Sequence, residues 1–402
     1  MKWLAVWVFF CSSLLCGALG AEPSTVLVIT NVNVVDTRFG GFRPNMTVTI
    51  KDGLIAAVSK IAIINPSPRV QMINGNGRFV IPGLWDMNTH LHQVGSVIAR
   101  KAMFQLYLAS GVTGLRDLDE STAADLRELS DLQPELEPAR LNGDERTPNT
   151  GIEGRRTIED LNDIFSACFA RRVDFQETPA VPSQEQAFNN KAANYRPEDG
   201  RKVFLDISDH ATWVIPSLVS SEFAATGFSD DRGHRKPSAV SLGDEGSAPK
   251  FVGTTELKRD LELVREMHRT GVQFLTGTNG PSANLLPGMP LQRELELLVE
   301  GGLSPLEALQ AATVNSALYM VKLDKYGTVE RAHAANLVLL DGNPLQDIGN
   351  TRKIAAVVMR GQYFSQSDLE TMVARALNDL NQEKTTDVES RPGNSTANDL
   401  PH

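Results

Sequence analysis

The pattern of apolar residues changes twice along this chain, and that change restricts the fold most strongly. Residues 25–59 alternate apolar and polar side chains in short β-branched runs, and similar runs return at 335–340 and 354–361. Between them, wholly apolar strands such as 112–117 and 272–276 lie next to amphipathic helical stretches such as 255–269. Alternation predicts strands with one solvated face, whereas apolar strands flanked by helices predict a parallel sheet covered on both faces. We therefore expect an α/β protein whose two ends pair into one smaller β domain.

Composition and charge exclude several classes of protein. The 402 residues are 41% hydrophobic and 22% charged, which is typical of a globular chain. The net charge of −10 and the absence of a basic run with interleaved aromatic residues argue against a nucleic-acid partner. The composition leaves the oligomeric state open.

The first residues resemble a secretory signal. Lys2 precedes the apolar run 3–15, and Ala18-Leu19-Gly20 is a small-residue cleavage site, so residues 1–20 are interpreted as a signal peptide. A retained membrane anchor is the alternative, but the run is short for a membrane span. We expect an exported protein, periplasmic or extracellular, that has no stable membrane anchor after cleavage. Cys168 would be its only cysteine, and we expect a buried thiol without a catalytic role.

Two histidines follow the apolar strand that begins near Phe79. His90 and His92 are two residues apart, so in a strand they share one face and form a plausible zinc pair. Two imidazoles alone do not complete a zinc site, because an open site needs three ligands. Two partly exposed histidines at a strand end are the alternative interpretation.

At this point the chain resembles the amidohydrolase superfamily, in its imidazolonepropionase-like and Xaa-Pro-dipeptidase-like branch. The resemblance rests on ordered blocks, which are 31–36, 80–92, 111–117, 271–280, 303–313, 327–330 and 337–344. It implies a metal-dependent-hydrolase barrel of the (β/α)8 type, at residues 81–326, and a small β-sandwich built from residues 21–80 and 327–365. It also implies hydrolysis of C–N bonds in amides, cyclic amides or dipeptides. The polar stretch 382–402 is expected to be a disordered tail.

Transfer of the family's site residues places neutral amides at two key positions. The family's His-x-His metal pair falls on Asn88 and His90, and its general base, an Asp after Gly-Thr, falls on Asn279. An amide oxygen is a poorer zinc ligand than imidazole and does not accept a proton near neutral pH. The bridging-ligand position falls on Glu177, for which a solvated surface glutamate is the alternative. Candidate ligands for a divalent metal, zinc above all, are therefore His90, His92, Asn88 and Glu177.

The central region is also too short for the eight βα units of a complete barrel. A barrel unit takes about 31 residues, so the three units expected between the Val173 strand and the Trp213 strand need about 94, whereas these residues are 40 positions apart. We expect strands five and six to be missing. The leading interpretation is an amidohydrolase with impaired chemistry acting on a small molecule or dipeptide; the alternative is a non-catalytic remnant or binding module without the metal centre. The sequence leaves enzymatic activity undecided.

Overall fold

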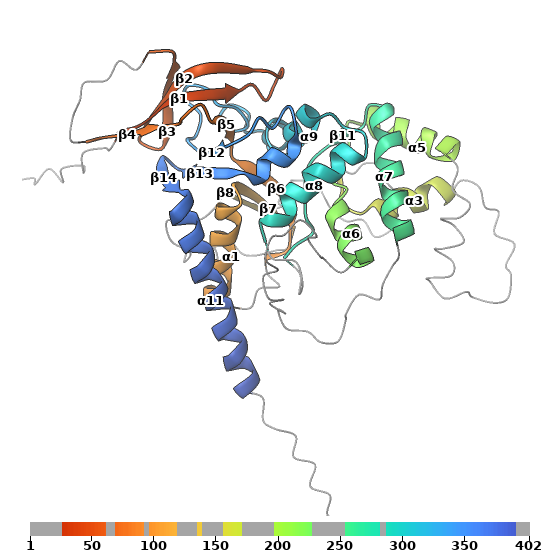
Figure 1. Ribbon diagram of the computed structural model, residues 1–402. Coiled ribbons are helices and arrows are strands. Elements are labelled where there is room, and N and C mark those ends of the chain that lie inside the picture. The colour runs from red at the N-terminus through yellow and green to blue at the C-terminus, as the bar shows by residue number, and fades with distance from the viewer. Residues whose placement is uncertain are drawn as a thin grey trace, which may run out of the picture.

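The computed structural model describes residues 26–61, 69–91, 96–118, 135–138, 156–170, 197–226, 254–281 and 287–390. These residues form one large sheet and two smaller ones, with helices packed against them (Figure 1). The expected signal peptide lies outside the described residues. Within the described part, no helix has the length and apolar character needed to cross a membrane.

Strands from both ends of the chain form an eight-stranded sheet. Its order is β14-β13-β12-β5-β1-β2-β3, and β4 pairs with β1. The N-terminal strands are β1 (Val26–Val35), β2 (Phe42–Lys51), β3 (Leu54–Ser59), β4 (Val70–Asn74) and β5 (Phe79–Pro82); the C-terminal ones are β12 (Leu337–Leu340), β13 (Ile354–Met359) and β14 (Gln362–Ser365). The two groups meet where β5 runs antiparallel to β12. The two β-rich ends therefore lie in one sheet, while the domain limits at 80 and 327 stay predictions.

The turn between β2 and β3 shows why the sequence folds as a hairpin here. Asp52 and Gly53 both have left-handed backbone angles, with φ of 53° and 75°. A two-residue turn of this kind matches the twist of antiparallel strands and favours Asp-Gly. A Cβ at Gly53 would lie 3.2 Å from the carbonyl oxygen of Arg360, so the glycine also permits close contact with the β13–β14 turn.

The central strands are parallel and form two three-stranded sheets. One contains β6 (Leu84–Thr89), β7 (Val112–Asp117) and β8 (Glu135–Pro138), and the other contains β9 (Thr157–Ile158), β10 (Trp213–Val214) and β11 (Gln273–Phe274). A parallel bridge between Thr89 and Gly280 connects them, and the amide of Met87 donates to the carbonyl of Thr276 over 2.8 Å. In the described part of the chain these strands do not close into a barrel.

One of the two central sheets contains a short strand, β9, that the sequence pattern does not indicate. The neighbour of β10 on the side away from β11 is β9, which precedes Val173 in the chain. A barrel-type strand therefore occurs earlier than the expected strand at Val173–Glu177, and that expected strand lies outside the described residues. Periodicity could not reveal β9, because it has only two residues. The absence of strands five and six stays a prediction.

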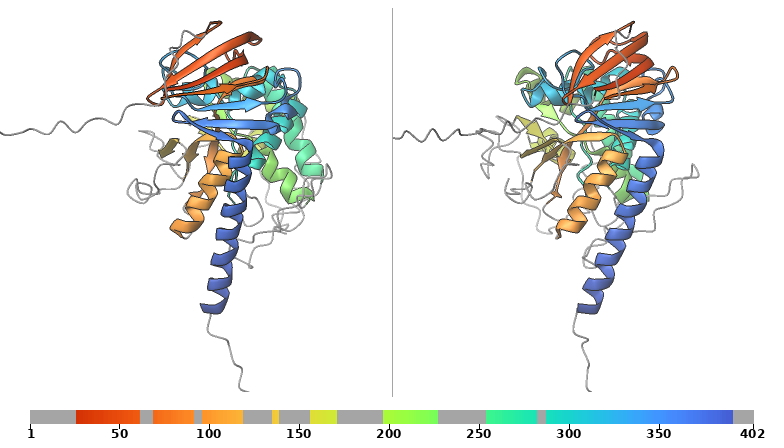
Figure 2. Two further views of the ribbon diagram at one scale, coloured as in Figure 1. Left: turned by 60° about the vertical axis from the view of Figure 1, so that its left-hand side comes forward. Right: turned by 90° about the vertical axis from the view of Figure 1, so that its left-hand side faces the viewer.

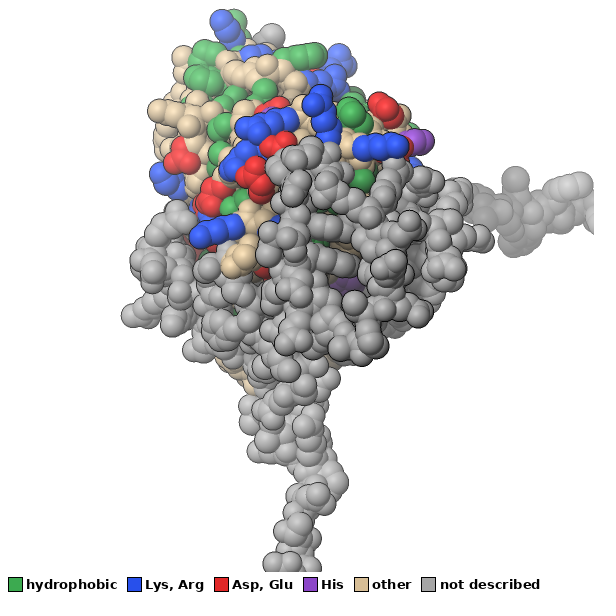
Figure 3. Space-filling view, turned by 90° about the vertical axis from the view of Figure 1, so that its right-hand side faces the viewer, with side chains coloured by type: hydrophobic (Ala, Val, Ile, Leu, Met, Phe, Trp, Pro, Cys, Tyr) green, Lys and Arg blue, Asp and Glu red, His purple; other side chains and the backbone are tan. Residues whose placement is uncertain are grey.

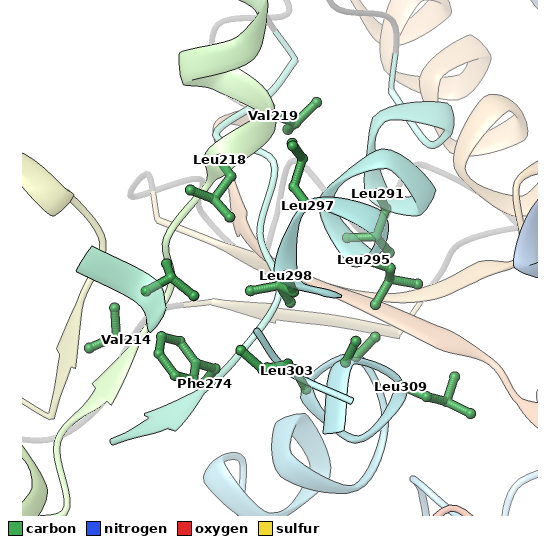
Figure 4. Close-up of a cluster of buried hydrophobic side chains, with 14 of the residues drawn as sticks. Val214, Leu218, Val219, Phe274, Leu291, Leu295, Leu297, Leu298, Leu303 and Leu309 are labelled. Carbon is green, nitrogen blue, oxygen red and sulfur yellow. The ribbon is translucent and has the colours of Figure 1, made fainter. Parts of the chain in front are cut away.

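Helices cover the central strands and build the larger core. They are α1 (Val97–Ala109), α3 (Leu161–Ala170), α5 (Pro197–Asp209), α6 (Leu218–Thr226), α7 (Thr254–Arg269), α8 (Met289–Glu300), α9 (Pro305–Ala311) and α10 (Val314–Tyr319), with the 3-10 turn η2 (Ile348–Arg352). Figure 4 shows side chains of α6 and α8 converging with Val214 and Phe274 of the strands. Cys168 belongs to this core and is buried, as expected.

The C-terminal helix α11 (Gln366–Ser390) corrects the expected tail. It lies beside α1 and extends away from the sheets (Figure 2). Residues 382–390, expected to be disordered, continue this helix, because Gln382, Glu383 and Lys384 are good helix formers that follow a turn already packed on α1. The side chain of Ser96, which caps α1, donates to Glu383. Residues 391–402 lie outside the described part.

Candidate functional site

Three of the predicted site residues meet where β6 and the segment after β11 end. The imidazole Nε2 of His90 lies 2.9 Å from Oδ1 of Asn279. The amide of Asn279 donates to the carbonyl of Asn88 over 2.9 Å, and the amide of His90 donates to the carbonyl of Gly280 over 2.8 Å. Asn88, His90 and Asn279 therefore converge at the carboxyl ends of parallel strands, the edge at which barrel enzymes place their sites.

The His90–Asn279 contact has a defined direction. A carbonyl oxygen only accepts a hydrogen bond, so Nε2 of His90 carries the proton and donates it to Asn279. A metal-binding imidazole nitrogen must instead offer a lone pair. In this arrangement, Nε2 of His90 is used by Asn279 and not directed at a cation.

Asn88 is buried beneath this pair. It is 1% exposed, and its Nδ2 donates to Oγ of Ser217 over 3.0 Å. Its Oδ1 is buried and accepts no hydrogen bond from the described residues. A Cβ at Gly277 would lie 2.5 Å from the Cβ of Asn88, so the glycine allows the β11 segment to approach β6 this closely.

A buried carboxyl group, Asp86, orders the segment that carries Asn279. Its Oδ1 accepts from the amide of Thr278 over 3.0 Å, and its Oδ2 accepts from the Thr278 hydroxyl over 2.6 Å. Burial raises the pKa of Asp86 to about 7, and the bonds from Thr278 oppose that rise only in part. Asp86 thus holds the residue immediately before Asn279.

A second buried carboxyl group, Glu294 of α8, holds the other side of the site. Its Oε2 accepts from the amide of Val219 over 2.7 Å, at the beginning of α6 and close to Ser217. Burial raises the pKa of Glu294 to about 8, and the negative charge of Asp86 adds to the rise. The sequence pattern does not predict this role for Glu294. Its one signal is a charged residue on the apolar face of α8 that Leu291, Leu295 and Leu298 form.

The other two candidate ligands, His92 and Glu177, lie outside the described residues. His268 contacts Glu307 over 3.0 Å, and the ring of His333 bonds to the hydroxyl of Thr328 over 3.0 Å. These two histidines therefore form structural contacts elsewhere in the molecule.

The described donor groups do not fit a zinc centre. Zinc sites use imidazole, thiolate and carboxylate ligands, whereas this group offers one imidazole, engaged by Asn279, and two neutral amides. Among the described residues, no three His, Cys, Asp or Glu side chains gather in a way that could hold a metal ion.

Comparison with known proteins finds a family match in the C-terminal half of the chain. The model of the amidohydrolase family matches residues 201–364. An adenine deaminase from Listeria innocua is 25% identical over 350 residues, covering 83% of this chain and 57% of the deaminase. Ochratoxinase from Aspergillus niger is 37% identical over 82 residues, covering 20% of this chain and 16% of ochratoxinase. The chain spans less than two thirds of the length of these adenine deaminases.

Solved structures agree on the fold. An Xaa-Pro dipeptidase with bound methionine has a TM-score of 0.53 at 17% identity, covering 85% of this chain and 100% of the dipeptidase. A prolidase from Bifidobacterium longum, described as putative, has a TM-score of 0.53 at 21% identity, covering 88% and 99% of the two chains. Residues 201–364 thus match the amidohydrolase family, whose members generally use divalent metals, and the family resemblance noted in the sequence is supported.

Proposed function

We propose that this chain is an amidohydrolase-superfamily protein whose metal-dependent hydrolysis is impaired and which retains the family's place for a small amide-bearing molecule or dipeptide. The hydrogen bond from His90 Nε2 to Asn279 Oδ1, at 2.9 Å, carries the proposal. It satisfies an imidazole and an amide without a cation. Asn279 also does not supply a base near neutral pH, because an amide oxygen is not protonated there.

On this proposal, the chain's own residues bind the small molecule but do not catalyse its hydrolysis. His90 and Asn279 lie at the strand ends and offer polar groups to an amide, while Asp86 and Glu294 hold the segments on both sides. A divalent ion, with zinc as the ion to test, would need further ligands from outside this group. His92 and Glu177 are the candidates that the sequence provides.

Metal content tests this proposal. We expect freshly purified protein to hold far less than one zinc per chain by elemental analysis after exposure to zinc and desalting. The double variant Asn88→His/Asn279→Asp should hold more, because it restores an imidazole and a carboxylate. A tightly held ion in the unmodified chain, lost in His90→Ala, would overturn the proposal and justify assays on dipeptides and cyclic amides.

We also propose that the protein is exported, on the basis of Lys2, the apolar run 3–15 and the small residues at 18–20. Amino-terminal sequencing of the protein recovered outside the cytoplasm should begin near residue 21. A mature protein that still begins at Met1 would contradict this.

A further inference from the structure

Asn279 is followed directly by glycine. We propose that the Asn279–Gly280 peptide deamidates spontaneously and so places a carboxylate at the position where the family has its general base. The inference rests on the proposed function for the meaning of that position. The deamidation itself depends only on the local sequence and geometry.

The reaction needs only water. The backbone nitrogen of Gly280 loses its proton and attacks Cγ of Asn279, forming a C–N bond, while the Cγ–Nδ2 bond breaks and ammonia leaves. Water then adds to the cyclic imide. Opening at Cγ gives aspartate, and opening at the backbone carbonyl gives isoaspartate. The net change is one water consumed and one ammonia released.

The dipeptide favours the first step. Glycine has no side chain to obstruct the approach of its nitrogen to Cγ. Asn279 is an exposed residue, so water reaches it, and its φ is 54°. The sequence also has Asn-Gly at 74–75, 76–77 and 142–143, so dipeptide chemistry alone does not single out Asn279.

His90 distinguishes Asn279 from the other two Asn-Gly sites among the described residues, at 74–75 and 76–77. Its Nε2–H donates to Oδ1 of Asn279 over 2.9 Å. Attack on Cγ moves negative charge onto this oxygen, and a donor already aimed at it stabilises that charge, as in an oxyanion hole. The backbone bonds from Asn279 to Asn88 and from His90 to Gly280 keep the donor and the dipeptide together.

Asn76–Gly77 provides an internal reference. Asn76 is exposed and has a φ of 53°, close to the 54° of Asn279. It lies in the turn between β4 and β5, on the eight-stranded sheet and away from the strand ends that carry His90. The two sites share the dipeptide and the backbone angle but differ in two respects: Asn76 has no such histidine among the described residues, and the amide of Gly77 donates to the carbonyl of Asn31 over 2.8 Å. The variant His90→Phe separates the effect of the histidine from that of the engaged amide.

The experiment follows both amides by peptide mass spectrometry. The purified full chain is incubated in mildly alkaline buffer, and digests sampled over weeks are analysed with a method that separates aspartate from isoaspartate. We expect acid at position 279 to accumulate several-fold faster than at 76, and His90→Phe to remove most of that difference. Gly280→Ala should strongly slow conversion at 279. If that variant fails to fold, Asn279→Gln serves instead, since its longer side chain closes the ring less readily.

Retention of the amide at 279 through the incubation would overturn the inference, as would equal rates at 279 and 76. The result is separable from the test of the proposed function, because peptide masses are read without reference to metal or activity. Metal content is measured on fresh protein, before conversion.

Discussion

Glu294 is an acidic residue on the apolar face of α8, and its burial has a consequence for stability. Its pKa rises from 4.5 to about 8 in the folded protein. A carboxyl group whose pKa is raised on folding stabilises the fold fully below its unfolded pKa, and that contribution falls as the pH rises towards the folded pKa. Because of Glu294, the free energy of unfolding should therefore fall as the pH rises from 4.5 to about 8.

Glu294→Gln tests this directly. Glutamine keeps an oxygen for the amide of Val219 and does not ionise. We expect the free energy of unfolding, measured by urea denaturation, to fall less steeply with pH in this variant than in the unmodified protein. The two slopes should differ by up to ~1.4 kcal/mol per pH unit. Asp86, with a pKa of about 7, should supply part of the remaining slope. An unchanged slope would contradict the prediction, and Glu370→Gln, at an exposed position of α11, is the control.

At the level of elements, the contact between α1 and α11 helps to hold the C-terminal helix on the molecule. The interface buries Ala99, Ala102, Met103, Leu106, Ala376 and Leu380. Small residues on both helices let the two backbones, which lie side by side in Figure 2, approach each other, and Leu380 is buried in the same cluster.

Leu380→Ala should destabilise the protein by about 2–4 kcal/mol, because it removes a side chain that is 1% exposed and leaves a cavity. Leu318→Ala is the matched control. Leu318 is 50% exposed, so we expect a loss below ~1 kcal/mol. Thermal and urea denaturation measure both. Similar losses in the two variants would show that the α1–α11 contact is not the cause.

Helices and strands with a clear repeat of apolar residues could be predicted from the sequence, whereas very short strands and isolated buried polar residues could not. The amphipathic stretch 255–269 is α7 in the structure, and the apolar stretch 354–361 contains β13. Strand β9 has two residues and carries no period. The meeting of Asn88, His90 and Asn279 followed from the family resemblance, but Asp86, Ser217 and Glu294 did not, because a single buried polar residue has no spacing pattern to detect.

On the scale of the whole molecule, one side chain joins the two three-stranded sheets. Arg116 of β7 is 2% exposed; its Nη1 lies 3.2 Å from Oε1 of Glu159, and its Nη2 donates to the hydroxyl of Thr157 in β9 over 3.3 Å. The guanidinium also lies 5.3 Å from the ring centre of Tyr319. Arg116 thus connects strands from opposite sheets.

Arg116→Met should cost about 3 kcal/mol of stability, since it leaves Glu159 without this guanidinium. The exposed pair Arg78–Asp341, at 2.7 Å, is the comparison, and Arg78→Met should cost less than ~1 kcal/mol. In the coloured, described part of the face in Figure 3, acidic and basic side chains lie beside one another, so replacing one exposed charge there should have a small effect on stability. A loss in Arg116→Met no larger than in Arg78→Met would contradict a linking role.

The pairing of β5 with β12 also sets an order of events during synthesis. β5 ends at Pro82, and its antiparallel partner begins at Leu337, so the ribosome must make the whole central region before this pair can form. Until then, the growing chain presents an unpaired strand edge, which is a template for pairing with other chains. A nascent chain stalled before residue 337 should therefore depend on chaperones and aggregate when released, even though most of its residues have already been made.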